Sequence, residues 1–303
     1  MGFVEDEIPW EGGRVSRRVL CVRANNPSPM TYVGTNTWIV AEPGAHACVV
    51  IDPAPAGEQV QRILAACEAQ NLCVGAIVAT HDHPDHIEGI PQLVRATGAP
   101  VYAPREQRIV RLFAGEWGSA VGAAGEGMAD GGAAGALPEQ KALVPVHHLA
   151  EGTFCPFEGA PKFEVLALPG HSQDSVGLLL PAEKALFTGD VLFRHGPTVV
   201  FHPDGVLGSY FETLDKLEAL VRAGEVLRFY PGHGYPIEDP LPIIQATRAH
   251  REERLSQVRE ALASGTPANP EALFDVVYRG VDPALRAPSL RSIRAQLKYL
   301  GVK

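Results

Sequence analysis

The chain has 303 residues, 46% of them hydrophobic, and carries 26 lysines and arginines against 35 aspartates and glutamates. This length and composition are enough to bury a core in one large domain or in two unequal ones. No segment approaches the roughly 18 apolar residues that a membrane span needs, and residues 1–10 are partly acidic, unlike a secretory signal. We therefore expect a cytoplasmic globular protein with no membrane partner.

The net charge of −9 is unevenly distributed. Residues 241–303 hold ten basic and six acidic side chains, whereas the rest of the chain is strongly acidic. A basic tail can mark an anionic partner or substrate, although solvated helix faces explain it equally well. The acidic total argues against strong unspecific binding to nucleic acid, and no DNA partner is predicted.

Short runs rich in β-branched residues predict a sheet in the first part of the chain, with strands at 19–23, 35–41 and 47–51. Apolar residues at helical spacing then predict a helix at 58–70. An apolar strand at 74–80 and a helix at about 86–97 follow. Residues from about 114 to 137 are mostly glycine and alanine, which predicts a long flexible insertion.

A dense cluster of polar residues follows the strand predicted at 74–80. It contains His81, His83, Asp85 and His86 within six residues. Imidazole and carboxylate are the ligand types that suit zinc and similar divalent ions. The cluster therefore predicts a metal site, with a solvated histidine-rich loop as the alternative.

Three later strands, predicted at 163–168, 185–188 and 226–230, are each followed by glycine and then by a residue that can bind metal. These residues are His171, Asp190 and His233. Glycine permits the tight backbone that aims a side chain across the edge of a sheet. Each signal is weak alone, but together with the cluster at 81–86 they predict one common site. The chain then becomes helical at 242–264, 271–279 and 283–300.

The motifs THDHPDH, PGH at 169–171, TGD at 188–190 and PGHG at 231–234 resemble those of the metallo-β-lactamase superfamily. The resemblance implies an α/β fold, an αββα sandwich over residues 1–240, with a helical region at 241–303 packed on it. It implies two zinc ions per chain, with manganese or iron as alternatives. The ligands implied for the first metal are His81, His83 and His171, and those for the second are Asp85, His86 and His233, with Asp190 bridging both.

Two divalent ions about 3.5–4 Å apart can share a hydroxide, because each lowers the pKa of bound water. This hydroxide would attack a carbonyl carbon or a phosphorus atom, and we predict that Asp85 and Asp190 act with it. Asp52 follows the strand at 47–51, where the superfamily commonly has an aspartate that supports a metal ligand from behind. A purely turn-forming role for Asp52 is equally open.

The segment at 34–37, the run HREER at 250–254 and the helical tail are similar to the β-lactamase-like protein 2 branch of the superfamily. The animal members of this branch are single-strand endoribonucleases, and its fungal relatives are thioesterases. The resemblance therefore implies a hydrolase of a thioester, ester or lactone, with a small-molecule acyl substrate, or else an enzyme that cleaves single-stranded RNA. The residues predicted to contact substrate are His195, His202, Tyr210, His250 and Arg251.

Three other interpretations remain open. Glyoxalase II has the same ligand types. A mononuclear iron oxidoreductase of the persulfide-dioxygenase kind shares the HxHxDH string. A non-enzymatic metal-binding module is the third, although these ligands leave positions for water instead of enclosing each ion.

Overall fold

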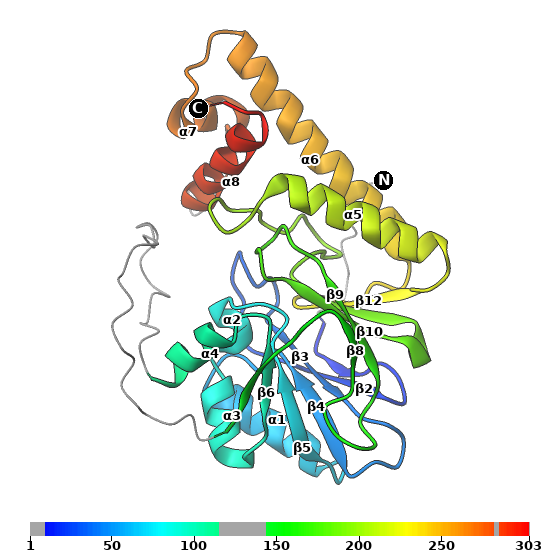
Figure 1. The fold of residues 1–303 in the computed structure, drawn as a ribbon. Coiled ribbons are helices and arrows are strands. Elements are labelled where there is room, and N and C mark those ends of the chain that lie inside the picture. Colours follow the sequence, from blue (N-terminus) through cyan, green and yellow to red (C-terminus); the bar gives the residue numbers. More distant parts are fainter. Residues whose placement is uncertain (1–9, 115–143, 282–284, 303) are drawn as a thin grey trace.

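Two stacked β-sheets form the centre of the protein (Figure 1). The structure is a computed structural model, and it describes residues 10–114, 144–281 and 285–302. The first sheet has seven strands in sequential order: β1 (Gly13–Arg14), β2 (Val19–Arg23), β3 (Asn36–Val40), β4 (Ala47–Ile51), β5 (Cys73–Val78), β6 (Val101–Ala103) and β7 (Val146–His148). The second sheet has five strands in the reverse of chain order: β12 (Arg228–Pro231), β11 (Ala185–Gly189), β10 (Val176–Leu180), β9 (Phe163–Ala167) and β8 (Gly152–Phe154).

Helices cover the outer face of each sheet. The first sheet packs against α1 (Glu58–Glu68), α3 (Ile90–Thr97) and α4 (Glu106–Phe113). The second sheet packs against α5 (Leu207–Arg222) and α6 (Pro240–Ala263). Short helices lie at α2 (Pro84–Ile87) and at the 3₁₀ turn Pro181–Glu183, and the chain ends with α7 (Pro270–Val277) and α8 (Arg286–Tyr299). None of the described helices is both long enough and apolar enough to cross a membrane.

Large aromatic side chains hold the two sheets together. Trp38, Phe163, Phe187 and Tyr230 are fully buried between them, and the rings of Trp38 and Tyr230 lie 4.9 Å apart. Burying each such side chain contributes about 1.5–3 kcal/mol. Because this core fixes one sheet against the other, the ends of β5, β9, β11 and β12 meet at a single edge of the sandwich.

The predicted αββα sandwich with carboxyl-terminal helices is confirmed. The predicted continuous helix at about 86–97 is wrong, because the chain forms α2 and α3 with a break at Gly89. Pro91 explains the break, since proline lacks the N–H that would continue the helix and its ring clashes with the carbonyl four residues earlier. Residues 115–137 of the predicted insertion lie outside the described residues, and the domain boundary at residue 240 stays a prediction.

Candidate metal centre

The six-residue cluster at the end of β5 is positioned by a buried strand and a one-turn helix. β5 pairs in parallel with β4 and β6, and its last three residues are buried. The chain then turns at His83, which is the N-cap of α2, and Pro84 occupies the first turn of that helix. Proline suits this position because its φ angle is already helical and it has no N–H to leave unpaired. As a result, His81 and His86 are both buried at the edge of the sandwich.

The other three predicted ligands reach the same edge from the second sheet. His171 follows β9 through Gly170, whose φ angle of 137° is one that L side chains rarely adopt. A Cβ atom on Gly170 would also lie 2.4 Å from the backbone of Tyr210 on α5. Asp190 follows β11, and His233 follows the last residue of β12 by two positions. Glycine at 170 therefore lets the chain turn tightly against α5 and present His171.

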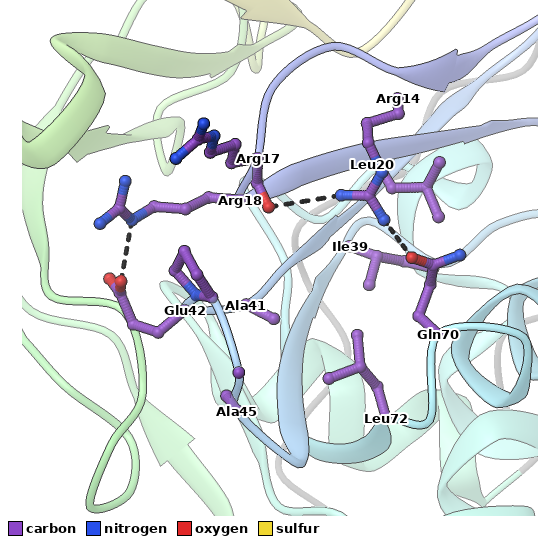
Figure 2. A pocket seen from close by; sticks show the side chains of 12 residues that line it. Arg14, Arg17, Arg18, Leu20, Ile39, Ala41, Glu42, Ala45, Gln70 and Leu72 are labelled. Atoms are coloured by element: carbon purple, nitrogen blue, oxygen red, sulfur yellow. Dashed lines mark hydrogen bonds and ion pairs between the residues drawn. The ribbon is translucent and has the colours of Figure 1, made fainter.

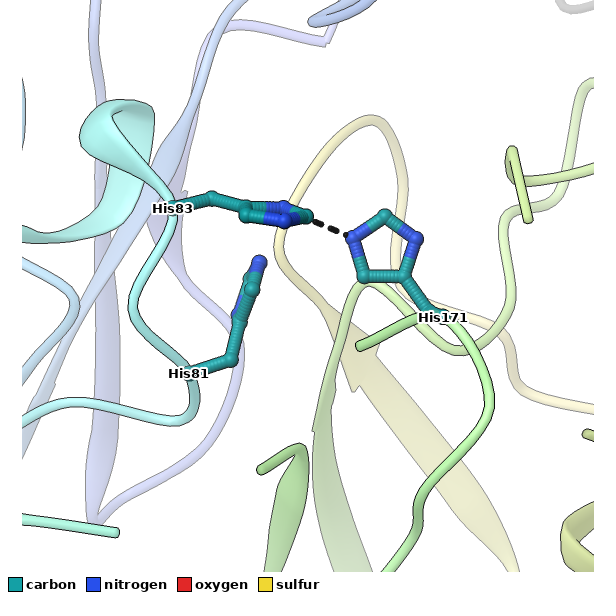
Figure 3. Close-up of side chains that lie close together, drawn as sticks. All are labelled: His81, His83 and His171. Carbon is teal, nitrogen blue, oxygen red and sulfur yellow. Dashed lines mark hydrogen bonds between the residues drawn. The ribbon is translucent and has the colours of Figure 1, made fainter. Parts of the chain in front are cut away.

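The structure brings all seven predicted ligands together in two adjacent groups. Within each group the candidate ligand atoms all lie within 4.8 Å of one another, in the sets His81, His83 and His171, and Asp85, His86, Asp190 and His233. In the first group His83 Nδ1 lies 3.0 Å from His171 Nε2 (Figure 3).

Asp190 lies between the two groups. Its Oδ1 atom is 3.1 Å from His86 Nε2, and its Oδ2 atom is 3.3 Å from His233 Nε2. The same Oδ2 atom is 3.8 Å from His171 Nε2, a member of the first group. Asp85 completes the second group, with its Oδ2 atom 3.2 Å from His233 Nε2. A carboxylate in the position of Asp190 can serve ions on both sides.

Buried ring nitrogens provide a test of whether these residues suit a metal. The Nε2 atoms of His81, His86 and His233 and the Oδ1 atom of Asp190 are buried, and none makes a well-formed hydrogen bond among the described residues, although His86 and His233 lie within ion-pair distance of Asp190. A buried polar atom without a partner is costly, by about 1–3 kcal/mol. Four such atoms in one place are what a metal-binding set requires, so both groups could hold a divalent ion.

Each imidazole is oriented by an oxygen atom on the side away from the two groups. His86 Nδ1 lies 2.9 Å from Asp52 Oδ2, His171 Nδ1 lies 2.8 Å from the Val199 carbonyl, and His233 Nδ1 lies 3.4 Å from the Gly34 carbonyl. His81 Nδ1 contacts the Thr80 hydroxyl at 3.1 Å, and His83 Nε2 contacts Asp204 Oδ2 at 3.3 Å. Partners of this kind fix the ring and leave the opposite nitrogen free to bind metal.

Asp52 joins the turn to the metal centre. Its carboxylate accepts hydrogen bonds from the Thr80 backbone N–H at 2.8 Å and from the Thr80 hydroxyl at 2.7 Å, besides its contact with His86. Its own φ angle of 54° is that of a turn residue. Both interpretations of Asp52 left open by the sequence therefore describe its position, because the turn is what aims the carboxylate at His86.

The pKa shifts separate His81 and His171 from the imidazoles that lie near carboxylates, among them His83 of the first group, whose pKa burial lowers but Asp204 and Asp85 raise overall. Burial and the neighbouring His83 lower the pKa of His171 to about 4, and burial also lowers that of His81. Burial lowers the pKa of His233 as well, but Asp190 and Asp85 outweigh it and raise that pKa to about 9. The pKa of His86 is raised by the same kind of balance. Without metal, the second group is therefore a network of protonated imidazoles and ionised carboxylates.

Metal binding to the second group should release protons at neutral pH. His233 has a pKa of about 9, so in the metal-free protein it keeps its proton at pH 7, and a metal must displace that proton. Metal affinity should therefore rise as the pH increases from 7 to 9. Titration calorimetry at pH 7, in two buffers of different ionisation enthalpy, measures the release. Equal apparent enthalpies in the two buffers would contradict it, and at pH 9.5, above the pKa of His233, the proton release from His233 should fall to about a quarter of its value at pH 7.

Asp204, which the sequence did not single out, holds His83 from behind. It also lies 3.7 Å from Arg105, the residue before α4. The structure offers Asp82, His83 and Asp204 as a third group that could hold a metal. However, Asp82 is paired with Arg108 at 3.0 Å and with Arg105 at 3.4 Å. These two arginines already neutralise the third group, so we interpret Asp204 as a positioning residue.

The Asp204→Asn variant should bind metal about 10–100-fold more weakly, because the ring of His83 loses its charged partner. Competition with a chromophoric chelator measures this affinity directly and without substrate. Asp215→Asn is the matched control, because Asp215 is 69% exposed on α5 and pairs with Arg248. If the two variants bound metal equally well, Asp204 would have no positioning role.

The five predicted substrate contacts occupy different environments. The Tyr210 side chain is buried, and its hydroxyl donates a 2.7 Å hydrogen bond to the Val191 carbonyl. Its hydroxyl proton is therefore used within the fold. Arg251 is also buried and donates to the Thr198 carbonyl. His195 packs its ring 4.9 Å from Tyr235.

His202 and His250 are both half-buried. Burial lowers the pKa of His250 to about 4, with Arg251 and Arg254 adding to the shift. His202 lies two residues before Asp204, on the segment that approaches the metal centre.

A surface hollow of about 170 Å³ lies away from these residues (Figure 2). It is lined by Arg14, Arg18 and Glu42 among others, and includes none of the predicted site residues. Two of its three arginines are engaged, since Arg18 pairs with Glu42 at 2.8 Å and Arg14 donates to Gln70. We assign no role to this hollow.

Comparison with known proteins agrees with this geometry. Residues 30–233 match the family model of the metallo-beta-lactamase superfamily. The beta-lactamase-like protein 2 homolog of Caenorhabditis elegans is 25% identical over 292 residues, which cover 95% of this chain and 85% of that protein. An atrochrysone carboxyl ACP thioesterase of Aspergillus aculeatus is 30% identical over 275 residues, which cover 88% of this chain and 74% of that protein.

Solved structures share the fold. A beta-lactamase domain protein from Burkholderia ambifaria superposes with a TM-score of 0.71 at 20% identity, covering 98% of this chain and 90% of that one. A protein solved in a di-iron-bound form has a TM-score of 0.53 at 28% identity, covering 73% of this chain and 96% of that one. The predicted resemblance is confirmed, and the chain belongs to the metallo-beta-lactamase superfamily.

Proposed function

We propose that this superfamily hydrolase uses two divalent metal ions, zinc in the first instance, to hydrolyse an acyl thioester, ester or lactone. The observation that carries the proposal is the convergence of seven ligand-type side chains into two adjacent groups with unpartnered buried atoms. Relatives named as ACP thioesterases favour a thioester among the three bonds.

The two ligand groups would differ in charge. His81, His83 and His171 would hold one ion through three imidazoles, and the second group would hold the other through two imidazoles and two carboxylates. When bound, such ions polarise a carbonyl oxygen and lower the pKa of a water molecule to about 7. The Asp85 side chain is 28% exposed and Asp190 only 7%. We therefore propose that Asp85, the more exposed of the two carboxylates, accepts a proton from an attacking water and passes it to solvent.

Cleavage of single-stranded RNA is the second candidate. It is favoured by the basic carboxyl-terminal segment, in which ten of residues 241–303 are lysine or arginine. Phosphodiester cleavage would use the same ligand groups, so the site alone does not separate the two functions.

A substrate panel tests the proposal. The zinc-loaded protein is assayed with an acyl thioester, an aryl ester, a lactone, a phosphodiester and a single-stranded RNA, with His83→Ala as the control for contaminating activity. We expect hydrolysis of the thioester by the native protein and none by the variant. Activity on no substrate, or equal activity in the variant, would defeat the hydrolase proposal.

Metal content separates hydrolase from oxidoreductase. The di-iron-bound neighbour makes iron a metal to test. Mass spectrometry of protein purified without added metal should find close to two equivalents of metal per chain. A single equivalent of iron with oxygen uptake on a persulfide would instead favour the dioxygenase.

A further inference from the structure

The last helix carries an exposed row of positive charge. Arg291, Arg294 and Lys298 are exposed on α8 and are spaced three and four residues apart, so they share one face of the helix. Arg286, on the same helix, lies 3.7 Å from Asp275. Within the described ranges, no carboxylate lies within ion-pair distance of the other three. We call Arg291, Arg294 and Lys298 the α8 basic row.

The α8 basic row adjoins the segment that leads to the metal centre. The guanidinium of Arg291 lies over the ring of Phe201, with its Cζ atom 4.7 Å from the ring centroid. Phe201 is three residues before Asp204, whose carboxylate contacts His83. Tyr299 anchors the other end of α8, with its ring 5.6 Å from that of Phe211 on α5. Figure 1 shows α8 beside α5 and above α2.

His202 adds a polar group beside the row. Its Nδ1 atom is buried and has no hydrogen-bond partner among the described residues. Burial lowers the pKa of His202, and the positive charges of Lys298 and Arg294 lower it further. Two unpaired cations and an unpartnered imidazole thus meet at the border of the metal centre, in a chain whose net charge is −9.

We propose that the α8 basic row binds the phosphate groups of the thiol carrier in an acyl thioester. Guanidinium and ammonium groups are the usual protein partners of phosphate. Seven residues of helix span about 10 Å, so the row can contact more than one phosphate. Because the row lies outside both ligand groups, it would bind a part of the substrate remote from the reacting bond. This inference rests on the proposed thioesterase function and names its substrate class.

The test compares a charged and an uncharged thioester of the same acyl group. One substrate is the coenzyme A thioester, and the other is the N-acetylcysteamine thioester, which has no phosphate. Combined Arg294→Glu and Lys298→Glu should lower kcat/KM for the coenzyme A thioester by at least about 10-fold, mainly through KM, since each lost charge-assisted contact is worth about a factor of ten. The same variant should hydrolyse the uncharged thioester at the native rate.

Combined Arg222→Glu and Arg259→Glu is the matched control, because both residues are exposed on other helices. This control makes the same change in net charge and should leave both substrates unaffected. Raising the salt concentration should weaken only the coenzyme A reaction of the native protein. If the α8 variant hydrolysed both thioesters as the native protein does, the inference would be overturned while the hydrolase function stood.

Direct binding separates the remaining outcomes. Calorimetry with coenzyme A, with phosphopantetheine and with a single-stranded RNA uses the zinc-loaded native protein and the α8 variant. Loss of coenzyme A binding in the variant supports the inference. Equal binding of phosphopantetheine would identify a carrier-linked arm as the source of the phosphate. If only RNA binding depended on the row, the inference would be wrong. If no thioester were hydrolysed, the proposed function would fail. If the α8 variant bound coenzyme A as tightly as the native protein does, the inference about the α8 basic row would be overturned, whatever the activity assay showed.

Discussion

The Asp85→Ala variant should bind one equivalent of metal where the native protein binds two. Asp85 Oδ2 lies 3.2 Å from His233 Nε2, and its side chain is 28% exposed. Removing it therefore takes a ligand from the second group without opening a cavity in the core. With one ion lost, kcat/KM should fall by at least about 10³-fold, because the second ion helps to generate the nucleophile and to stabilise developing charge.

Metal analysis after dialysis against limiting zinc, together with thermal unfolding, checks this result. Glu88→Ala is the matched control, because Glu88 lies three residues further along, is partly buried and belongs to neither ligand group. It should keep two equivalents of metal and the native rate. If Asp85→Ala also kept two equivalents and full activity, the assignment of a binuclear site would be wrong.

The strands that carry the site could be predicted because each is a local pattern. β4 agrees with its predicted range, β9 and β11 differ from theirs by one residue, and β5 and β12 differ by up to two. A glycine followed by a residue that can bind metal is a local pattern of two or three residues, so it can be recognised in the sequence alone. The family motifs then joined ligands as far apart in the chain as His81 and His233.

The residues behind the ligands could not be predicted, because their contacts are made only by the folded chain. Asp204 contacts His83 although the two residues are 121 positions apart in the chain. The local sequence around either residue does not indicate this contact. Arg251 shows the opposite case, since its sequence context suggested an anionic substrate. The fold instead buries it against the Thr198 carbonyl, 53 positions away. Thr198 in turn contacts His171 at 3.2 Å, so Thr198 links Arg251 to the metal centre.

The shortest strands could not be predicted for a different reason. β6, β7 and β8 have three residues each, which is too few for an alternating pattern to be distinguished from a loop. Their positions follow from pairing with neighbours, so they depend on tertiary structure.

Gly232→Ala should disable the second ligand group although residue 232 binds nothing itself. A Cβ atom on Gly232 would lie 2.4 Å from Asp190 Oδ1 and 2.5 Å from His86 Cε1. The backbone cannot retreat, because the N–H of Gly232 donates to the Gly189 carbonyl at 2.8 Å and its carbonyl accepts from Asn36 N–H at 2.7 Å. These bonds tie Gly232 to both sheets, so the two ligands must move instead.

The expected result is loss of one metal equivalent and a fall in kcat/KM of at least about 10²-fold, since a small displacement of reacting groups can cost that much. Overpacking of this kind should also destabilise the fold by about 1–3 kcal/mol. Gly208→Ala on α5 is the matched control, because its new Cβ atom would meet only the Tyr299 ring, at the ordinary distance of 3.8 Å. That variant should keep both metals and gain up to about 1 kcal/mol of stability from helix propensity.

Metal content and denaturant unfolding of the two variants distinguish a local effect from a global one. If Gly232→Ala lost stability but kept two metals, Asp190 and His86 would have more room than their contacts indicate. If it lost the metal while still unfolding cooperatively, with a loss of stability no greater than about 3 kcal/mol, the tight backbone at residue 232 would be established as a requirement of the site. Gly232, which precedes the ligand His233, would then be needed also for the ligands Asp190 and His86. Their side chains occupy the space that a Cβ atom at residue 232 would fill.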